Sequence, residues 1–137
     1  MKSPRQPQRS KAFTLVEIMI IVALIALISA LAMPNFLRAR KRAQATRILD
    51  DLRLVDGALD LYATENGKSV GDPAVWADLQ PYFKKDTALS NSNGLDLLGN
   101  AFNGGAYSVD TLPKLSQETF ASLSDVAPSD FWSPFAP

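Results

Sequence analysis

The chain has 137 residues, with fourteen bases, fourteen acids and neither histidine nor cysteine. These absences exclude disulfide staples, thiolate nucleophiles, imidazole acid–base catalysis and zinc sites of the usual ligand types. The formal charge of zero is unevenly distributed, because residues 1–12 carry four bases and no acid. Hydrophobic residues make up 47% of the chain and are concentrated in residues 18–33, where Ser29 is the single polar residue.

A basic N-terminus followed by an apolar run is typical of a secretory signal or a membrane anchor. A cleavable signal needs a small-residue site, and Ser29–Ala32 offers one. An anchor must cross ~30 Å of hydrocarbon, for which residues 18–33 fall short at about 24 Å of helix. Adding residues 13–17 extends the helix to about 31 Å, which is sufficient.

The extended span includes Glu17, whose charge is costly in a membrane, by about 2.5–3.5 kcal/mol at the centre and less near an end. Two interpretations remain open at this stage. Glu17 either reaches up to the lipid headgroups, or it pairs with a cation inside the apolar environment.

The pattern changes to an amphipathic helix after Met33. Pro34 has no N–H to donate to the carbonyl of Ala30, so a helix kink is expected there. Beyond it, apolar residues recur at spacings of 4, 3, 4 and 3, which places them on one helix face. These residues are Ile48, Leu52, Val55, Leu59 and Tyr62. The pattern predicts one nearly continuous helix from Phe13 to about Asn66, capped by Asn66–Gly67.

A basic cluster follows the apolar run and has three interpretations. The positive-inside rule would place the following domain in the cytoplasm, although the N-terminus is basic too. A nucleic-acid patch is disfavoured because no aromatic residues interleave with the bases. The remaining interpretation is headgroup contact together with salt bridges between packed subunits. The cluster comprises Arg38, Arg40, Lys41, Arg42 and Arg47.

Residues 68–137 are predicted to form a small second unit. Asp72 and Pro73 are expected to cap and start a short helix over residues 74–79. Two short strands are predicted at residues 95–102 and 105–109, a helix at 116–123 and an extended aromatic segment at 128–137. Such a small unit is expected to gain stability when its sheet packs on the helical stripe. The expected fold is an α+β lollipop, a transmembrane and then amphipathic N-terminal helix packed on a small antiparallel β-sheet.

The segment Lys11–Met19, K-A-F-T-L-V-E-I-M, resembles the prepilin motif of type IV pilins and type II secretion pseudopilins. The resemblance implies cleavage by a prepilin peptidase between Ala12 and Phe13, followed by N-methylation of Phe13. It also implies that Glu17 pairs with the Phe13 amine of a neighbouring subunit during assembly. Pro34 stands where this family commonly has a kinking proline. Ala12 departs from the pattern, since the family nearly always has glycine there.

The same resemblance implies a pilin-like domain organisation. Residues 1–12 would be the leader, 13–36 the transmembrane and assembly half of the helix, 37–67 its amphipathic half and 68–137 the globular unit. The expected function is a structural subunit of a pilus-like filament, foremost a type II secretion pseudopilin. The alternatives are a type IV pilus pilin, serving adhesion, motility or DNA uptake, and a non-polymerising single-pass protein that displays a small binding domain.

The implied partners are copies of the chain, the prepilin peptidase, an inner-membrane assembly platform and minor pilins or pseudopilins. The chain would sit in a bacterial inner membrane as a single-pass protein with its C-terminal domain in the periplasm, and then in the filament. No nucleic acid is expected as a partner. Catalysis is not expected either, since the sequence has no phosphate-binding glycine loop, nucleophile elbow or metal motif.

The segment Asp96–Phe102, D-L-L-G-N-A-F, is similar to a D-P-W-G-N-x-Y turn of major pseudopilins. Those proteins often bind calcium in an acidic C-terminal loop, for which Asp125 and Asp130 are the candidates here. Calcium takes 6–8 oxygen ligands, and two aspartates supply few of them, so a turn or helix-cap role is the competing interpretation. No other cofactor is expected.

Overall fold

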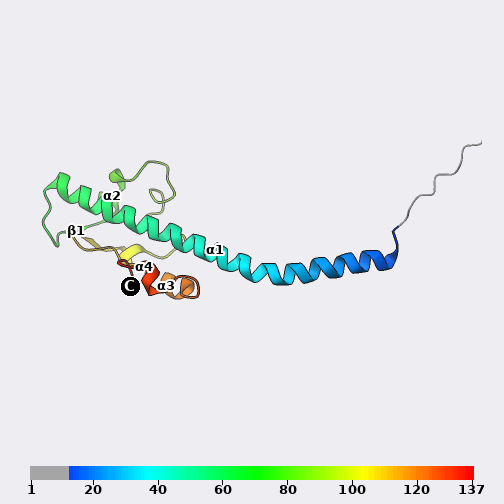
Figure 1. Ribbon diagram of the computed structural model, residues 1–137. Helices are drawn as coiled ribbons and strands as arrows, with labels where there is room; N and C mark the ends of the chain where they lie inside the picture. The colour runs from blue at the N-terminus through cyan, green and yellow to red at the C-terminus, as the bar shows by residue number, and fades with distance from the viewer. Residues whose placement is uncertain (1–12) are drawn as a thin grey trace, which may run out of the picture. The chain divides into compact units, whose positions relative to one another are not determined.

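The computed structural model describes residues 13–137 (Figure 1). These residues fall into two compact units, one up to Leu37 and one from Arg38 to Pro137, and each is described by itself. The elements in chain order are α1 (Leu15–Asn66), β1 (Pro73–Ala74), α2 (Trp76–Leu79), the 3-10 helices η1 (Gln80–Tyr82) and η2 (Phe102–Gly105), β2 (Tyr107–Ser108), α3 (Gln117–Leu123) and α4 (Ser129–Trp132). The predicted α+β class, a long N-terminal helix with a small antiparallel sheet, is confirmed.

Helix α1 ends where its sequence predicts. Gly67 has a φ of +57°, the left-handed conformation that glycine adopts without a Cβ penalty. The N–H of Lys68 donates to the carbonyl of Ala63 at 3.0 Å and so satisfies one of the last carbonyls of the helix. The expected cap at Asn66–Gly67 is therefore confirmed.

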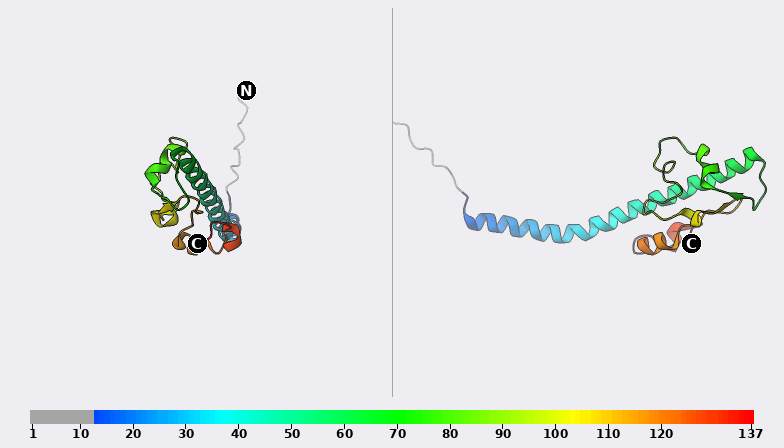
Figure 2. Two further views of the ribbon diagram at one scale, coloured as in Figure 1. Left: turned by 90° about the vertical axis from the view of Figure 1, so that its left-hand side faces the viewer. Right: turned by 180° about the vertical axis from the view of Figure 1, so that it is seen from behind.

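The apolar stripe of α1 is the base of the core in the unit from Arg38 onward. All five stripe residues, from Ile48 to Tyr62, are buried, as the 3.6-residue periodicity predicts. The chain after α1 lies along this part of the helix in both views of Figure 2. Core residues from that chain include Leu79, Phe102, Leu123 and Trp132.

The sheet is smaller than expected and is paired differently. Strands β1 and β2 are antiparallel, with Pro73 opposite Ser108 and Ala74 opposite Tyr107. The predicted strand at 105–109 is present as β2, but the predicted strand at 95–102 is wrong. That segment is a turn closed by one bridge between Leu95 and Ala101, because its backbone groups bond locally.

The start of α2 also differs from expectation. Asp72 does not cap it, because its carboxylate accepts the N–H of Ser69 at 2.9 Å and Pro73 belongs to β1. The helix instead starts at Trp76, where the Asp78 carboxylate accepts the N–H of Val75 at 3.0 Å. An aspartate three residues into the helix thus supplies the acceptor that was expected from Asp72.

The C-terminal residues are partly as predicted. Helix α3 occupies the expected position, and the hydroxyl of Ser116 accepts the N–H of Thr119 at 3.2 Å as its N-cap. Residues 128–137 are not extended throughout, since they contain α4. This turn buries Trp132 completely and lets its indole N–H donate to the carbonyl of Ala127 at 3.0 Å.

A buried polar network joins the Asp96 turn to α3. One carboxylate oxygen of Asp96 accepts the N–H groups of Leu98 and Asn100 at 2.8 and 3.0 Å. The other accepts the hydroxyl of Thr119, which itself accepts from the Asn100 amide and the Ser116 hydroxyl, each at 2.9 Å. The Thr119 hydroxyl therefore uses its one donor and both acceptor sites.

Gly94 allows a close approach between this turn and two aromatic rings. It has a φ of +81°, and a Cβ there would lie 3.2 Å from the Tyr107 hydroxyl and 3.3 Å from the Trp76 ring. The Trp76 ring also stacks on Phe83 at 4.9 Å. Burial raises the pKa of Tyr107 to about 12, so its hydroxyl stays protonated at physiological pH.

We predict that Gly94→Ala destabilises the protein by about 1–3 kcal/mol, because it combines a strained φ with a crowded Cβ. Gly99→Ala is the matched control, since Gly99 has a φ of +88° but nothing within 4 Å of a Cβ. Thermal unfolding of the full chain in detergent measures both. Equal losses in the two variants would contradict the packing argument.

We predict that Thr119→Val costs roughly 2–4 kcal/mol, because it leaves a buried carboxylate oxygen of Asp96 and the half-buried amide of Asn100 without partners. Valine keeps the shape of the side chain, so the loss reports on hydrogen bonding rather than on volume. Thr119→Ser keeps the hydroxyl and is expected to lose about 1 kcal/mol or less. Urea unfolding of the full chain tests this ranking, and a serine variant as unstable as the valine variant would refute it.

Candidate processing and assembly site

The predicted processing junction lies between Ala12 and Phe13. Phe13 is exposed, and the hydroxyl of Thr14 accepts the N–H of Glu17 at 3.2 Å, which caps the first turn of α1. The leader, residues 1–12, and with it Ala12, lie outside the described residues. Thr14 is a residue that the sequence analysis missed, although its T-x-x-E spacing to Glu17 is a capping-box signal.

The apolar half of α1 is exposed along its whole length in a single chain. Every residue from Phe13 to Arg40 is exposed, and α1 is long and apolar enough to cross a membrane. The one polar side chain in the run, Ser29, donates its hydroxyl to the carbonyl of Ile25 at 2.8 Å. Its hydrogen-bonding need is therefore met inside the helix, as a lipid or apolar protein environment requires.

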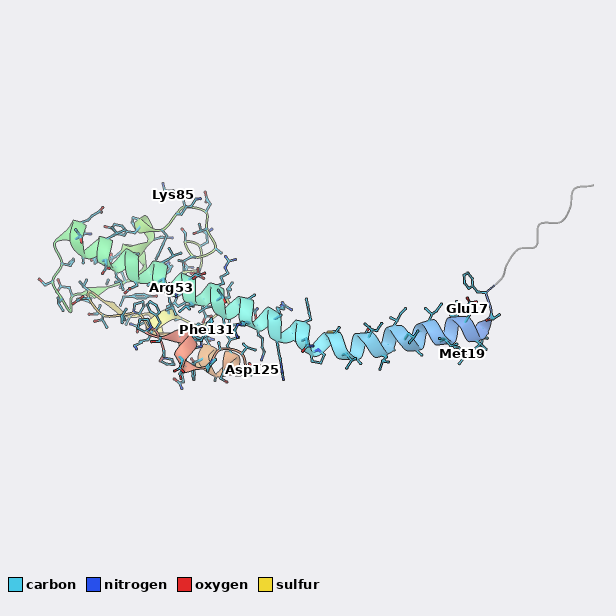
Figure 3. All side chains as sticks on the ribbon, viewed as in Figure 1. Glu17, Met19, Arg53, Lys85, Asp125 and Phe131 are labelled. Carbon is cyan, nitrogen blue, oxygen red and sulfur yellow. The ribbon has the colours of Figure 1, made fainter. Side chains whose placement is uncertain are left out.

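Glu17 is the acid of this apolar segment and lies in the first turn of α1 (Figure 3). It makes no ion pair within residues 13–137. Phe13 precedes it by four residues, which is about one turn of helix. The pairing of Glu17 with a Phe13 amine requires cleavage and stays a prediction.

Pro34 lies inside α1, which continues through it without interruption. Proline has no N–H, so the carbonyl of Ala30 lacks its usual helical partner. The kink at Pro34 stays a prediction.

Two members of the basic cluster hold the C-terminal segment on α1. Lys41 forms a salt bridge with Asp125 at 3.0 Å, and its ammonium group also donates to the carbonyl of Ser122. The guanidinium of Arg42 lies 5.8 Å from the centre of the Phe131 ring, which is cation–π geometry. Asp125 and Phe131 are labelled beside the same stretch of α1 in Figure 3. These intrachain contacts were not expected from the sequence.

The calcium candidates Asp125 and Asp130 lie on either side of the start of α4. Asp125 is engaged by Lys41, and the Asp130 backbone carbonyl accepts the N–H of Ser133 in the turn of α4. Residues 13–137 contain no cluster of three or more metal-binding side chains. A calcium ion takes 6–8 oxygens, and binding by Asp125 and Asp130 stays a prediction.

Comparison with known proteins finds similarity in the N-terminal region of the chain. The model of the prokaryotic N-terminal methylation motif matches residues 7–33. Type II secretion system core protein G of Klebsiella pneumoniae is 33% identical over 61 residues, which is 44% of each chain. The same core protein of Pseudomonas aeruginosa is 29% identical over 82 residues, 60% of this chain and 56% of that protein.

A pilus protein matches as well. The type IV wide pilus major component of Thermus thermophilus is 33% identical over 72 residues, 53% of this chain and 55% of that protein. The chain thus spans about half the length of these curated relatives. No solved structure matches the chain significantly.

The matching motif and relatives confirm the resemblance that the K-A-F-T-L-V-E segment indicates. The relatives are named as secretion and pilus components, in agreement with the prediction that this chain is not an enzyme. The N-terminal region of the chain therefore carries the prokaryotic methylation motif and is distantly homologous to type II secretion core protein G and to a type IV pilus component.

Proposed function

We propose that this chain is a structural subunit of a helical pilus-like filament, foremost a type II secretion pseudopilin that takes part in protein secretion. Residues 1–12 are its leader, 13–36 the transmembrane and assembly half of the helix, 37–67 the amphipathic half and 68–137 the globular unit. The prepilin peptidase cleaves between Ala12 and Phe13, and Phe13 is N-methylated.

The observation that carries this proposal is the methylation motif on a helix whose apolar surface is fully exposed in one chain. Such a surface is stable in water only when it is covered. A bilayer covers it before assembly, and copies of the same helix cover it in a filament.

The subunit begins as a single-pass protein of a bacterial inner membrane, with its C-terminal unit in the periplasm. Its partners are copies of itself, the prepilin peptidase, the inner-membrane assembly platform and minor pilins or pseudopilins. Nucleic acid is not among them in this proposal.

A type IV pilus pilin is the second candidate. It is supported by the match to the Thermus pilus component, which is 33% identical over 53% of this chain, although the Pseudomonas core protein G match covers 60% of it. The two candidates differ in where the polymer is found. A pseudopilus subunit is required for secretion of an exoprotein, whereas a pilus subunit is recovered from filaments sheared off the cell surface.

Assembly in this proposal depends on the charge of Glu17. Cleavage creates an ammonium group on Phe13, and both charges then lie in an apolar environment. Leaving one partner of a buried ion pair alone costs roughly 3–5 kcal/mol, so pairing between subunits favours docking in one register. Glu17 donates its backbone N–H to the Thr14 cap, and within residues 13–137 its carboxylate makes no ion pair.

We predict that the mature chain starts at Phe13 and that the Phe13 amine is methylated. Mass spectrometry of the protein extracted from membranes is expected to show the loss of residues 1–12. Ala12→Gly restores the residue that the family usually has and is expected to be cleaved at least as completely. A mature chain that starts after Ala30 or Ala32 would identify an ordinary secretory signal and overturn the proposal.

We predict that Glu17→Leu leaves cleavage and membrane insertion intact but lowers filament yield by roughly a hundredfold or more, the equivalent of about 3–5 kcal/mol. Met19→Leu is the matched control, since it places the same residue on the same exposed turn of α1 without removing a charge. Yield is measured as mature chain in the sedimented filament fraction. Normal assembly of the Glu17→Leu chain would favour headgroup contact by Glu17 instead.

A further inference from the structure

The unit from Arg38 onward has an open groove between α1 and residues 82–89, with a volume of about 520 Å³. Its floor on α1 is formed by Leu54, Gly57 and Leu61. The two leucines are 57% and 52% exposed, and nothing lies within 4 Å of the position of a Cβ on Gly57. The floor is therefore an uncovered apolar strip on α1, beside the buried stripe of the same helix.

Basic side chains border this strip. Arg47 and Arg53 line the groove from α1, and Lys84 lines it from the facing segment, against one acid, Asp51. Figure 3 labels Arg53 on α1 and Lys85 on the facing loop. The groove thus combines an apolar floor with a net positive border, and its complement is a surface with an apolar tip and negative charge.

The same chain carries that complement elsewhere. Asp56, Asp60 and Asp110 line a hollow of about 190 Å³ together with Leu112, and no base lines it. Within the described residues, none of these three carboxylates makes an ion pair. Burial, and secondly the charge of Asp60, raise the pKa of Asp56, as crowding of unpaired carboxylates predicts.

The tip of this acidic surface is a tight turn. The N–H of Thr111 donates to the carbonyl of Ser108 at 3.2 Å, and Asp110 adopts a φ of +61°. Leu112 follows the turn and is 39% exposed. One apolar side chain beside a carboxylate matches what the groove offers.

The two surfaces lie on different sides of the molecule. At 3.6 residues per turn, Asp56 and Asp60 are about 110° around α1 from the Leu54–Leu61 strip. A contact between them therefore joins unlike surfaces of two copies. Such heterologous contacts build open helical assemblies when the rotation that relates successive copies does not close into a ring.

We propose that the groove between α1 and residues 82–89 binds the acidic turn of a second copy of this chain, with Leu112 of that copy on the Leu54–Leu61 strip and its Asp110 beside Lys84. This inference rests on the proposed filament function and names a contact between globular units, separate from the pairing at Glu17. In this contact each subunit binds one neighbour through its groove and another neighbour through its acidic turn.

Disulfide crosslinking of the full chain in cells tests this contact, because the sequence contains no native cysteine. The variant Leu61→Cys with Leu112→Cys is expected to give a ladder of dimers, trimers and larger species after oxidation. Co-expressed chains that carry one substitution each are expected to stop at dimers, and each single variant alone is expected to stay monomeric. Leu54→Cys with Leu112→Cys repeats the test at a second floor position.

The matched control is Val70→Cys with Leu112→Cys, since Val70 is 75% exposed and lies outside the groove. This pair is expected to stay monomeric. Sedimented filaments that contain either groove variant in reduced form but give no ladder would overturn the inference and leave the proposed function standing. A dimer from Leu61→Cys alone would indicate a self-complementary contact and would also overturn it. An uncleaved chain that enters no filament would overturn the proposed function and the inference together.

Coupling between charges provides a second readout. In the Leu61→Cys, Leu112→Cys background, Lys84→Met and Asp110→Asn are each expected to lower the ladder yield about two- to fivefold. Asparagine tolerates the positive φ at this position. If the two side chains meet, the combined variant loses no more than either single change. Multiplicative losses would show that the two charges do not meet and would overturn the assigned pairing.

Discussion

Burial of one stripe of α1 is the interaction on which residues 38–137 depend. Two strands of two residues each cannot hold a domain together, because so short a sheet buries little surface. The stripe from Ile48 to Tyr62 supplies a continuous apolar surface, and Leu79, Phe102 and Trp132 reach it from segments far apart in the sequence. The globular unit therefore needs the second half of α1 as part of its own core.

The first half of the same helix has the opposite character. It is apolar on all sides, and the structure leaves every residue from Phe13 to Arg40 exposed. Apart from the Ala30 carbonyl opposite Pro34, its backbone lies in a regular helix, Thr14 caps the first turn, and the Ser29 hydroxyl donates to the carbonyl of Ile25. A helix with its polar groups satisfied internally is suited to a bilayer or to the apolar interior of an assembly.

Tertiary contacts also engage two members of the basic cluster that follows the apolar run. The sequence favours headgroup contact and salt bridges between packed subunits for its five bases. In the folded chain Lys41 is held by Asp125, and Arg42 lies over Phe131. Both contacts join the C-terminal segment to α1 and engage these two bases within the chain.

The sequence by itself determined the features that follow from local periodicity and spacing. The extent of α1, its buried stripe, its glycine cap and helix α3 could all be predicted, because a 3.6-residue repeat and capping residues act within a few positions. The K-A-F-T-L-V-E spacing likewise identified the region that matches the methylation motif. Tertiary structure alone decided how β2 pairs, where Asp96 is buried and how Trp132 turns into the core. It also decided where the groove beside Leu54 and the acidic turn at Asp110 lie. Each of these depends on partners distant in sequence, whose approach no local pattern records.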